Sequence, residues 1–234
     1  MLGEVLDNEL FWVLLLSAYV LTITYLTKNL YSWMIRRVYK KEVAIYYNRK
    51  LIHIFAGGVV VLIVPIVFRD PIYPLLAGIF LGLVTYITHK SGKLLYWFQT
   101  KRDLNDVTFC FMWGFAIFLL WNIFEMNGIE GAKWIAIIPP AFIAFGDGIT
   151  GIIRNLTFHE RKKHPIGNVY MAGICIFIGY YFGDMAGLAL WGVLAAIVAS
   201  IFERYEFGII DDNVLITVSS TAILFIGGYI SVIM

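Results

Sequence analysis

Long apolar runs alternate with short polar segments along the whole chain, and none shows the ten-residue alternating pattern of barrel strands. About 17–25 mainly apolar residues are needed for one helical membrane span. By that rule we predict eight spans, at roughly 9–27, 51–68, 72–88, 107–124, 134–153, 169–183, 185–201 and 214–233. The sixth and seventh are short and are separated only by Gly183–Asp184, which predicts a tight hairpin. The fold class expected is an all-α polytopic transmembrane helix bundle.

Composition supports this class, because 60% of the residues are hydrophobic and 15% are charged. An average soluble domain has about 45–50% apolar and 25% charged residues. We therefore treat 1–234 as a single integral membrane domain surrounded by membrane lipids, in which 1–47 add a first span and a basic loop to a core at 48–234. No nucleic-acid partner is expected. The oligomeric state is left open, with a homodimer as one option.

The basic residues predict the orientation. All but two of the 18 Lys and Arg residues follow the first, third, fifth or seventh span, and the exceptions are Arg69 and Lys133. The positive-inside rule then places these four loops in the cytoplasm and both termini on the extracytoplasmic side of a cell or endoplasmic reticulum membrane. Because the opposite connections are short, any active site is expected to face the cytoplasm.

Asp147 is the only charged residue in 134–153, and glycines flank it. An ionised side chain at membrane depth costs at least a few kcal/mol unless something binds it, so Asp147 is a functional candidate, with a purely structural ion pair as the alternative. Arg154 follows about two turns later, and Lys162 and Lys163 lie in the next loop. A carboxylate beside basic side chains suits a polyphosphate bridged by a divalent cation. A topology signal explains the basic residues but not Asp147.

Polar residues also precede the second and fourth spans. If a helix starts near Asn48, Arg49 and His53 share one face, and His53 lies one turn inside an apolar span where a headgroup anchor has no use. In the loop before the fourth span, Asp103 and Asp106 are either metal ligands or helix caps.

Two carboxylates and an amide begin the last span: Asp211, Asp212 and Asn213. One such residue is enough to cap a helix. Three in a row favour metal coordination or proton abstraction in addition to capping.

These segments occur in the order of four motifs of a known family. RKLIHIFAGG is similar to R-K-x-x-H-x-x-x-G, GDGITG to G-D-x-x-A-x-x-x-G, the stretch from Lys163 to Asn168 to K-S-x-E-G-S, and DDNVLIT to D-N-L-T-x-P. Over about 48–230 the chain resembles the polyprenol kinase family, which contains dolichol kinase, phytol kinase and CTP-dependent diacylglycerol kinase and is distantly related to CDP-diglyceride synthases.

The chain departs from these motifs at several positions. The alanine and the following glycine of the second motif are Thr150 and Arg154, and the proline of the fourth is Thr217. In the third motif the two serines and the glutamate are replaced, at His164, Ile166 and Asn168. Without that glutamate, the nucleotide is expected to be bound in a geometry that differs from the family's. We therefore expect a divergent member with its own lipid substrate.

The resemblance implies phosphoryl transfer from CTP, or another nucleoside triphosphate, to a long-chain isoprenoid alcohol such as dolichol, polyprenol, geranylgeraniol or phytol. It implies Mg²⁺, or another divalent cation, on Asp147 and Asp212, with Asp147 at the catalytic centre and Asp211 or His53 taking the alcohol proton. The nucleotide would be bound by Arg49, Lys50, Arg154, Lys162, Lys163, Gly167, Asn168 and Asn213. The lipid tail would enter between helices near Gly57, Gly58, Gly78 and Gly82.

Two other functions are weighed against this one. A cytidylyltransferase acting on a lipid phosphate would use the same nucleotide and release pyrophosphate. An ion-coupled transporter would bind a cation at Asp147, in a helix broken beside Pro139–Pro140. Polar residues crowd the expected cytoplasmic edge instead of the midplane, which argues against transport.

Overall fold

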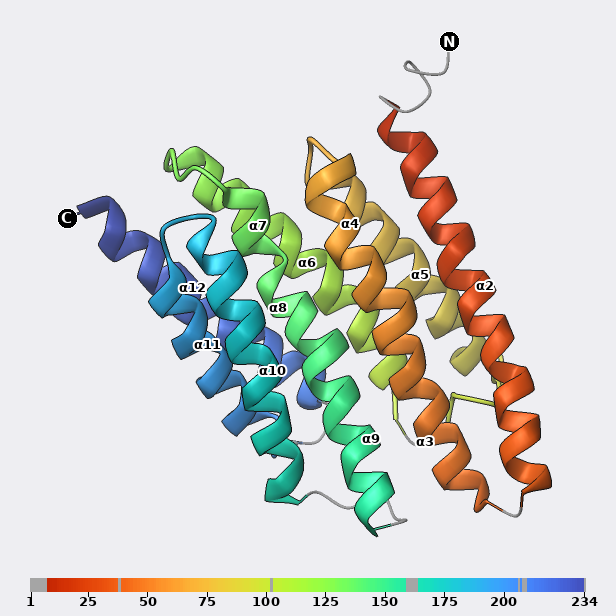
Figure 1. Ribbon diagram of the computed structural model, residues 1–234. Helices are drawn as coiled ribbons and strands as arrows, with labels where there is room; N and C mark the ends of the chain where they lie inside the picture. Colours follow the sequence, from red (N-terminus) through yellow and green to blue (C-terminus); the bar gives the residue numbers. More distant parts are fainter. Residues whose placement is uncertain are drawn as a thin grey trace.

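The computed structural model describes residues 8–37, 39–101, 103–158, 164–205, 207 and 210–233, and these ranges are almost entirely helical (Figure 1). The helices are α2 (Glu9–Arg36), α3 (Lys41–Ile52), α4 (Val59–Val67), α5 (Ile72–Lys90), α6 (Asn105–Met126), α7 (Ala132–Ala136), α8 (Ile138–Ala141), α9 (Asp147–Phe158), α10 (Pro165–Asp184), α11 (Ala189–Phe202) and α12 (Asp212–Ile233). A π-helical turn, η1 (His53–Gly58), joins α3 to α4, and another, η2 (Phe142–Gly146), joins α8 to α9. Within the described ranges no strand forms, apart from one isolated bridge between Phe207 and Ile210.

The all-helical, membrane-type fold is as predicted. Among the described residues, seven helical segments are long and apolar enough to cross a membrane, including the continuous segments Lys41–Val67 and Ala132–Phe158. The predicted seventh span corresponds to α11, which has only 14 residues and falls below the usual length. Its first residues form the turn after α10 instead, where Gly187 has a φ of +68°. The predicted number of eight spans is therefore not confirmed.

The helix that carries Arg49 and His53 begins earlier than expected, at Lys41 instead of near Asn48. Its first turns bury Ala44 and Ile45 in a small cluster with residues of α2 and of the segment between α5 and α6. This packing stabilises a helix that an apolar-run rule does not find.

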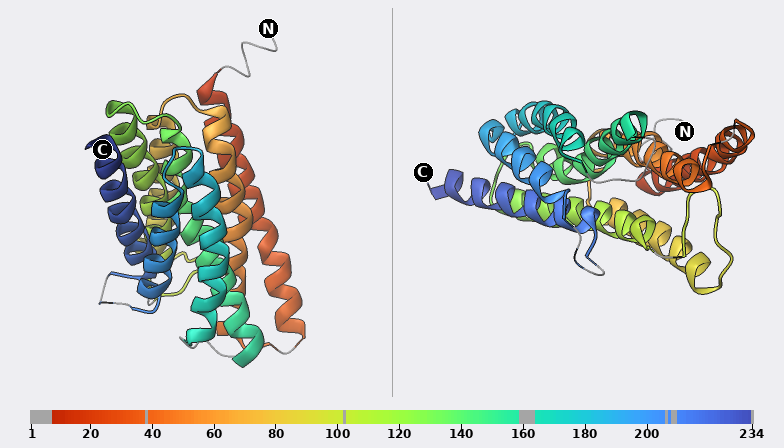
Figure 2. Two further views of the ribbon diagram at one scale, coloured as in Figure 1. Left: turned by 60° about the vertical axis from the view of Figure 1, so that its left-hand side comes forward. Right: turned by 90° about the horizontal axis from the view of Figure 1, so that it is seen from below.

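The helices lie in two layers, as the view along the bundle shows (Figure 2). One layer holds α2, the α3–α4 segment, α9, α10 and α11, and the other holds α5, α6 and α12. The segment Ala132–Phe158 is central, since 83% of its apolar window is buried.

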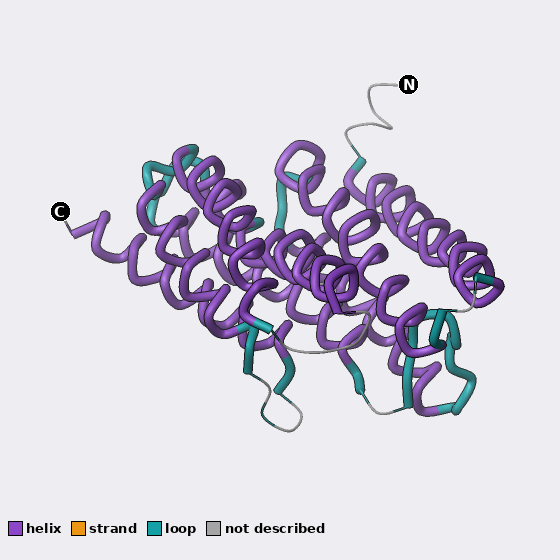
Figure 3. Tube along the Cα trace, turned by 60° about the horizontal axis from the view of Figure 1, so that its bottom comes forward, coloured by secondary structure: helices purple, strands orange, loops and turns teal. Residues whose placement is uncertain are grey.

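The last turns of α2, α5, α9 and α11 and the first turns of α3, α6, α10 and α12 lie together at one end of the bundle, which we call the basic end (Figures 1 and 3). The first turn of α2 and the last turn of α12 lie toward the opposite end (Figure 1).

Candidate functional site

Asp147 pairs with Lys50 at the centre of the site. The Lys50 ammonium lies 2.5 Å from both carboxylate oxygens of Asp147, and the two side chains are 4% and 1% exposed. Burying either charge alone would cost several kcal/mol, so each makes the other tolerable in the interior. Gly151 permits this approach, because a Cβ there would lie 2.6 Å from the Lys50 side chain.

A π-helical turn lies close to each residue of this pair. The turn η1 follows the helix that carries Lys50, and the turn η2 ends directly before Asp147. Such turns are rare and often mark functional sites, because they leave backbone groups outside the regular ladder. Near η1, the Phe55 carbonyl accepts a hydrogen bond from the Tyr19 hydroxyl at 2.7 Å. His53 opens this turn, places Nδ1 3.5 Å from Asp147 Oδ2 and stacks on Phe109. The structure therefore places His53 and Asp147, two candidates from the sequence, next to each other.

Arg154 forms a second buried ion pair, with Glu203. Its two terminal nitrogens donate to the two Glu203 oxygens at 2.7 and 2.8 Å, a bidentate arrangement that fixes both side chains. Asn168 completes the group, since its Oδ1 accepts from Arg154 at 2.9 Å and its Nδ2 donates to Glu203 at 2.9 Å. Gly167 leaves the space, because a Cβ there would lie 2.5 Å from Arg154 Nε.

The start of α12 is held by residues of α6. Asn105 donates to Asp212 at 3.3 Å, and the Asn213 amide donates to the Asn105 carbonyl at 2.9 Å. Asp211 accepts from the Thr108 hydroxyl and caps α12 through the backbone N–H of Val214 at 3.1 Å. Burial raises the pKa of Asp211 to about 6; the Asp212 carboxylate adds to this rise, and the Thr108 hydrogen bond opposes it. The predicted capping role is therefore present.

Three carboxylates converge between these groups. One oxygen each of Asp147, Glu203 and Asp212 lies within 4.8 Å of the others, and all three residues are buried. Hard divalent cations take oxygen ligands of this kind, so the donor set fits Mg²⁺. Asn213, which follows Asp212 in the chain, has a buried side-chain oxygen that accepts no hydrogen bond within the described part of the chain. Asp147 and Asp212 were predicted as metal ligands, whereas Glu203 was not.

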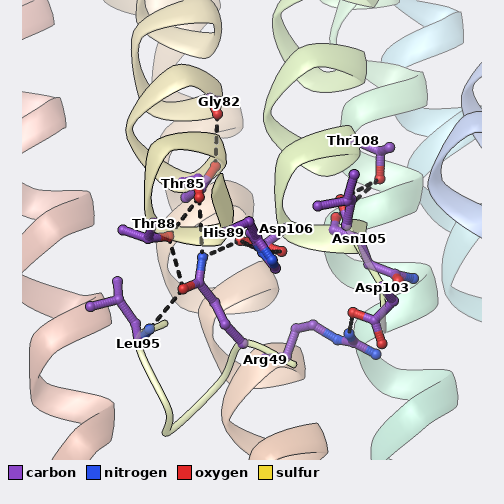
Figure 4. Close-up of polar contacts among 12 residues, drawn as sticks. Arg49, Gly82, Thr85, Thr88, His89, Leu95, Asp103, Asn105, Asp106 and Thr108 are labelled. Carbon is purple, nitrogen blue, oxygen red and sulfur yellow. Dashed lines mark hydrogen bonds and ion pairs between the residues drawn. The ribbon is translucent and has the colours of Figure 1, made fainter. Parts of the chain in front are cut away.

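The other predicted acidic residues have different partners. Asp103 lies 2.9 Å from Arg49, and Asp106 contacts His89 at 2.9 Å (Figure 4). Gln99 donates to Asp106 at 2.6 Å, which ties the segment between α5 and α6 to the bundle. Asp103 and Asp106 therefore pair with cationic or polar side chains, and the N-cap position of α6 is Leu104.

The structure thus brings most predicted site residues together from α3, η1, α9, α10 and α12. Lys50 and His53 lie against Asp147, Gly167 and Asn168 lie against Arg154, and Asp212 meets Asp147 and Glu203. Arg49 is turned toward Asp103 instead. Lys162 and Lys163 lie outside the described residues.

No family model, curated protein or solved structure matches the chain.

Proposed function

We propose that this protein is a lipid kinase that transfers a phosphoryl group, with CTP as the donor, to a long-chain isoprenoid alcohol at the cytoplasmic membrane face. One observation carries the proposal: three buried carboxylates from α9, α12 and the end of α11 meet beside the buried cations Lys50 and Arg154. A site for a metal-bound polyphosphate needs both charge signs in this proximity.

The chemistry required of the protein is mainly positioning and charge neutralisation. Bound Mg²⁺ would neutralise charge on the transferring phosphate, and Asp147, Glu203 and Asp212 are the residues that would hold it. Lys50 and Arg154 already neutralise two of these carboxylates. A metal–nucleotide complex carries both positive and negative charge. The carboxylates could therefore pair with the metal while Lys50 and Arg154 pair with the phosphates, and no buried charge would be left unpaired.

His53 is the favoured acceptor of the alcohol proton. Its ring lies beside Asp147 and also lines an apolar cavity between helices, so it lies at the boundary between charged and apolar regions. Asp211 is the alternative, because it follows α11, lies directly before Asp212 and accepts a hydrogen bond from the Thr108 hydroxyl through its carboxylate.

The departures from the family motifs compensate one another. Arg154 replaces a glycine of the second motif, and Asn168 replaces a serine of the third. The Arg154 guanidinium donates a hydrogen bond to the Asn168 side chain. Glu203 supplies a carboxylate to the same group, although the motif position at Ile166 lacks one. The carboxylate lost at Ile166 is thus replaced by Glu203, which supports a divergent kinase with an acidic site.

The substrate is tested with purified protein incubated with each nucleoside triphosphate and a panel of lipid alcohols. We expect a lipid monophosphate and CDP with CTP and an isoprenoid alcohol, detected by mass spectrometry of the extracted lipids. Matched reactions without nucleotide control for co-purified lipid phosphates. Failure of every nucleotide and alcohol pair to give a lipid phosphate would contradict the proposal.

Metal binding is tested by heat unfolding without nucleotide. A ligand at about 100 times its Kd stabilises the folded state by about 2.7 kcal/mol. For a chain of this size that corresponds to a Tm rise of roughly 5–10 °C. We expect Mg²⁺ to give this rise in the wild type and in the control Asp184→Asn, whose exposed carboxylate lies at the far end of α10. Glu203→Gln should lose most of it, whereas an equal rise in Glu203→Gln would exclude Glu203 as a ligand.

A further inference from the structure

An apolar cavity of about 130 Å³ lies between α2, the α3–α4 segment, α5 and α6. This is about ten times the volume that one water molecule needs. Its walls are almost entirely aliphatic and aromatic, and Leu95 and Phe98 line it from the segment between α5 and α6. A cavity with such walls favours a hydrocarbon occupant over water.

The cavity is long and narrow. Its lining runs over 13–24 on α2, over 49–60 on α3, η1 and α4 with Phe68 beyond them, and over 74–85 on α5. At 1.5 Å per residue, each stretch extends about 16 Å along its helix, roughly half the apolar thickness of a membrane. A small volume spread over this length has the shape of one extended chain.

Three ionisable residues, Arg49, His53 and Asp106, line one end of the cavity, although their polar atoms contribute almost none of its surface. Arg49 and His53 are only 4% and 3% exposed. Arg49 Nε and His53 Nδ1 make no hydrogen bond within the described ranges. His53 Nδ1 lies 3.5 Å from Asp147, so this end adjoins the carboxylate site. Figure 4 shows Arg49 and Asp106 among the polar side chains around the start of α6 and the end of α5.

Helix α2 closes the cavity loosely. Its buried residues are Leu16, Thr27, Tyr31 and Met34, and only Leu16 lies within the stretch that lines the cavity. The other three pack nearer the basic end. Along the cavity α2 is therefore only partly buried against its neighbours, as Val13 and Val20 also are, and the cavity is not fully enclosed.

We propose that this cavity holds the hydrocarbon chain of a single-chain lipid alcohol, with its hydroxyl at His53 and its tail directed toward Phe68. The apolar walls, the small volume and the position of His53 between the cavity and Asp147 together fit this one class of ligand. The proposal rests on the proposed function only for the fate of the hydroxyl, because binding of the chain needs no nucleotide.

The test is photo-labelling of the full-length protein without nucleotide, using a long-chain alcohol that carries a diazirine in its tail. Ser17→Trp would fill the cavity from α2, whereas its neighbour Ala18→Trp places the same side chain on the exposed face. We expect labelling to map to cavity residues in the wild type and in Ala18→Trp, and to fall at least about tenfold in Ser17→Trp. Should Ser17→Trp fail to fold, Ala77→Phe and the exposed Leu76→Phe form a second matched pair on α5.

Labelling spread evenly over lipid-facing residues, or unchanged by both cavity-filling variants, would overturn the proposal. Excess unlabelled single-chain alcohol should displace the probe, whereas equal displacement by a two-chain diacylglycerol would contradict the single-chain occupant. Lipid-phosphate formation is measured in parallel. Cavity labelling without phosphate formation leaves this inference standing and rejects the kinase; phosphate formation with labelling only outside the cavity does the reverse.

Discussion

Replacing Asp147 with Asn is expected to lower lipid-phosphate formation by at least roughly 10²–10³-fold, the range seen when one preorganised electrostatic group is lost. The variant removes a carboxylate from the proposed metal site. It also leaves Lys50 buried without its counter-charge, which should cost about 3–5 kcal/mol of folding stability. Activity and thermal unfolding, measured on the same purified sample, report the two effects separately.

A double variant separates the catalytic loss from the structural one. Combining Asp147→Asn with Lys50→Met removes both charges of the pair, and replacing a buried ion pair by apolar groups is often neutral for stability. We expect the double variant to unfold near the wild-type temperature and to remain inactive. Recovery of activity together with stability would show that Asp147 serves the fold alone.

Replacing Arg154 with Met is expected to destabilise the fold by about 3–5 kcal/mol, because the buried Glu203 carboxylate then loses its positive counter-charge. Arg154→Lys should recover only part of this loss, since an ammonium does not reproduce the bidentate contact with both oxygens. Thermal unfolding in one detergent measures both variants.

The matched control combines Arg154→Met with Glu203→Gln, which removes both charges. This double variant should be more stable than Arg154→Met alone, although it also lacks a proposed metal ligand and should be inactive. Equal stability of the single and double variants would show that the Arg154–Glu203 pair does not hold the helices together.

The apolar runs were enough to predict the helical class, because each span must satisfy its backbone internally and present apolar side chains. The same rule missed the first turns of α3, since Lys41 and Glu42 carry charges and the helix is stabilised by packing of Ala44 and Ile45. It also overestimated the length of α11, because the apolar residues just before Ala189 belong to the turn at Gly187 and not to the helix.

The site was predictable where a charge contrasts with its surroundings. Asp147 and His53 lie in apolar stretches, and the structure places them 3.5 Å apart. Glu203 was missed because it follows an apolar helix and reads as an ordinary loop residue. Its significance depends on Arg154, which is 49 residues earlier in the chain. The pairing of Lys50 with Asp147 joins residues 97 apart, and no local pattern indicates it.

Transfer of the terminal phosphate is the most direct test of the central claim. The purified protein is incubated with a long-chain isoprenoid alcohol and CTP labelled at either the γ- or the α-phosphate, with Asp147→Asn as the inactive control. The kinase predicts γ-label on the lipid, unlabelled lipid with α-labelled CTP, and release of CDP. Incorporation of the α-label with release of pyrophosphate, or no labelled lipid from either nucleotide, would contradict it.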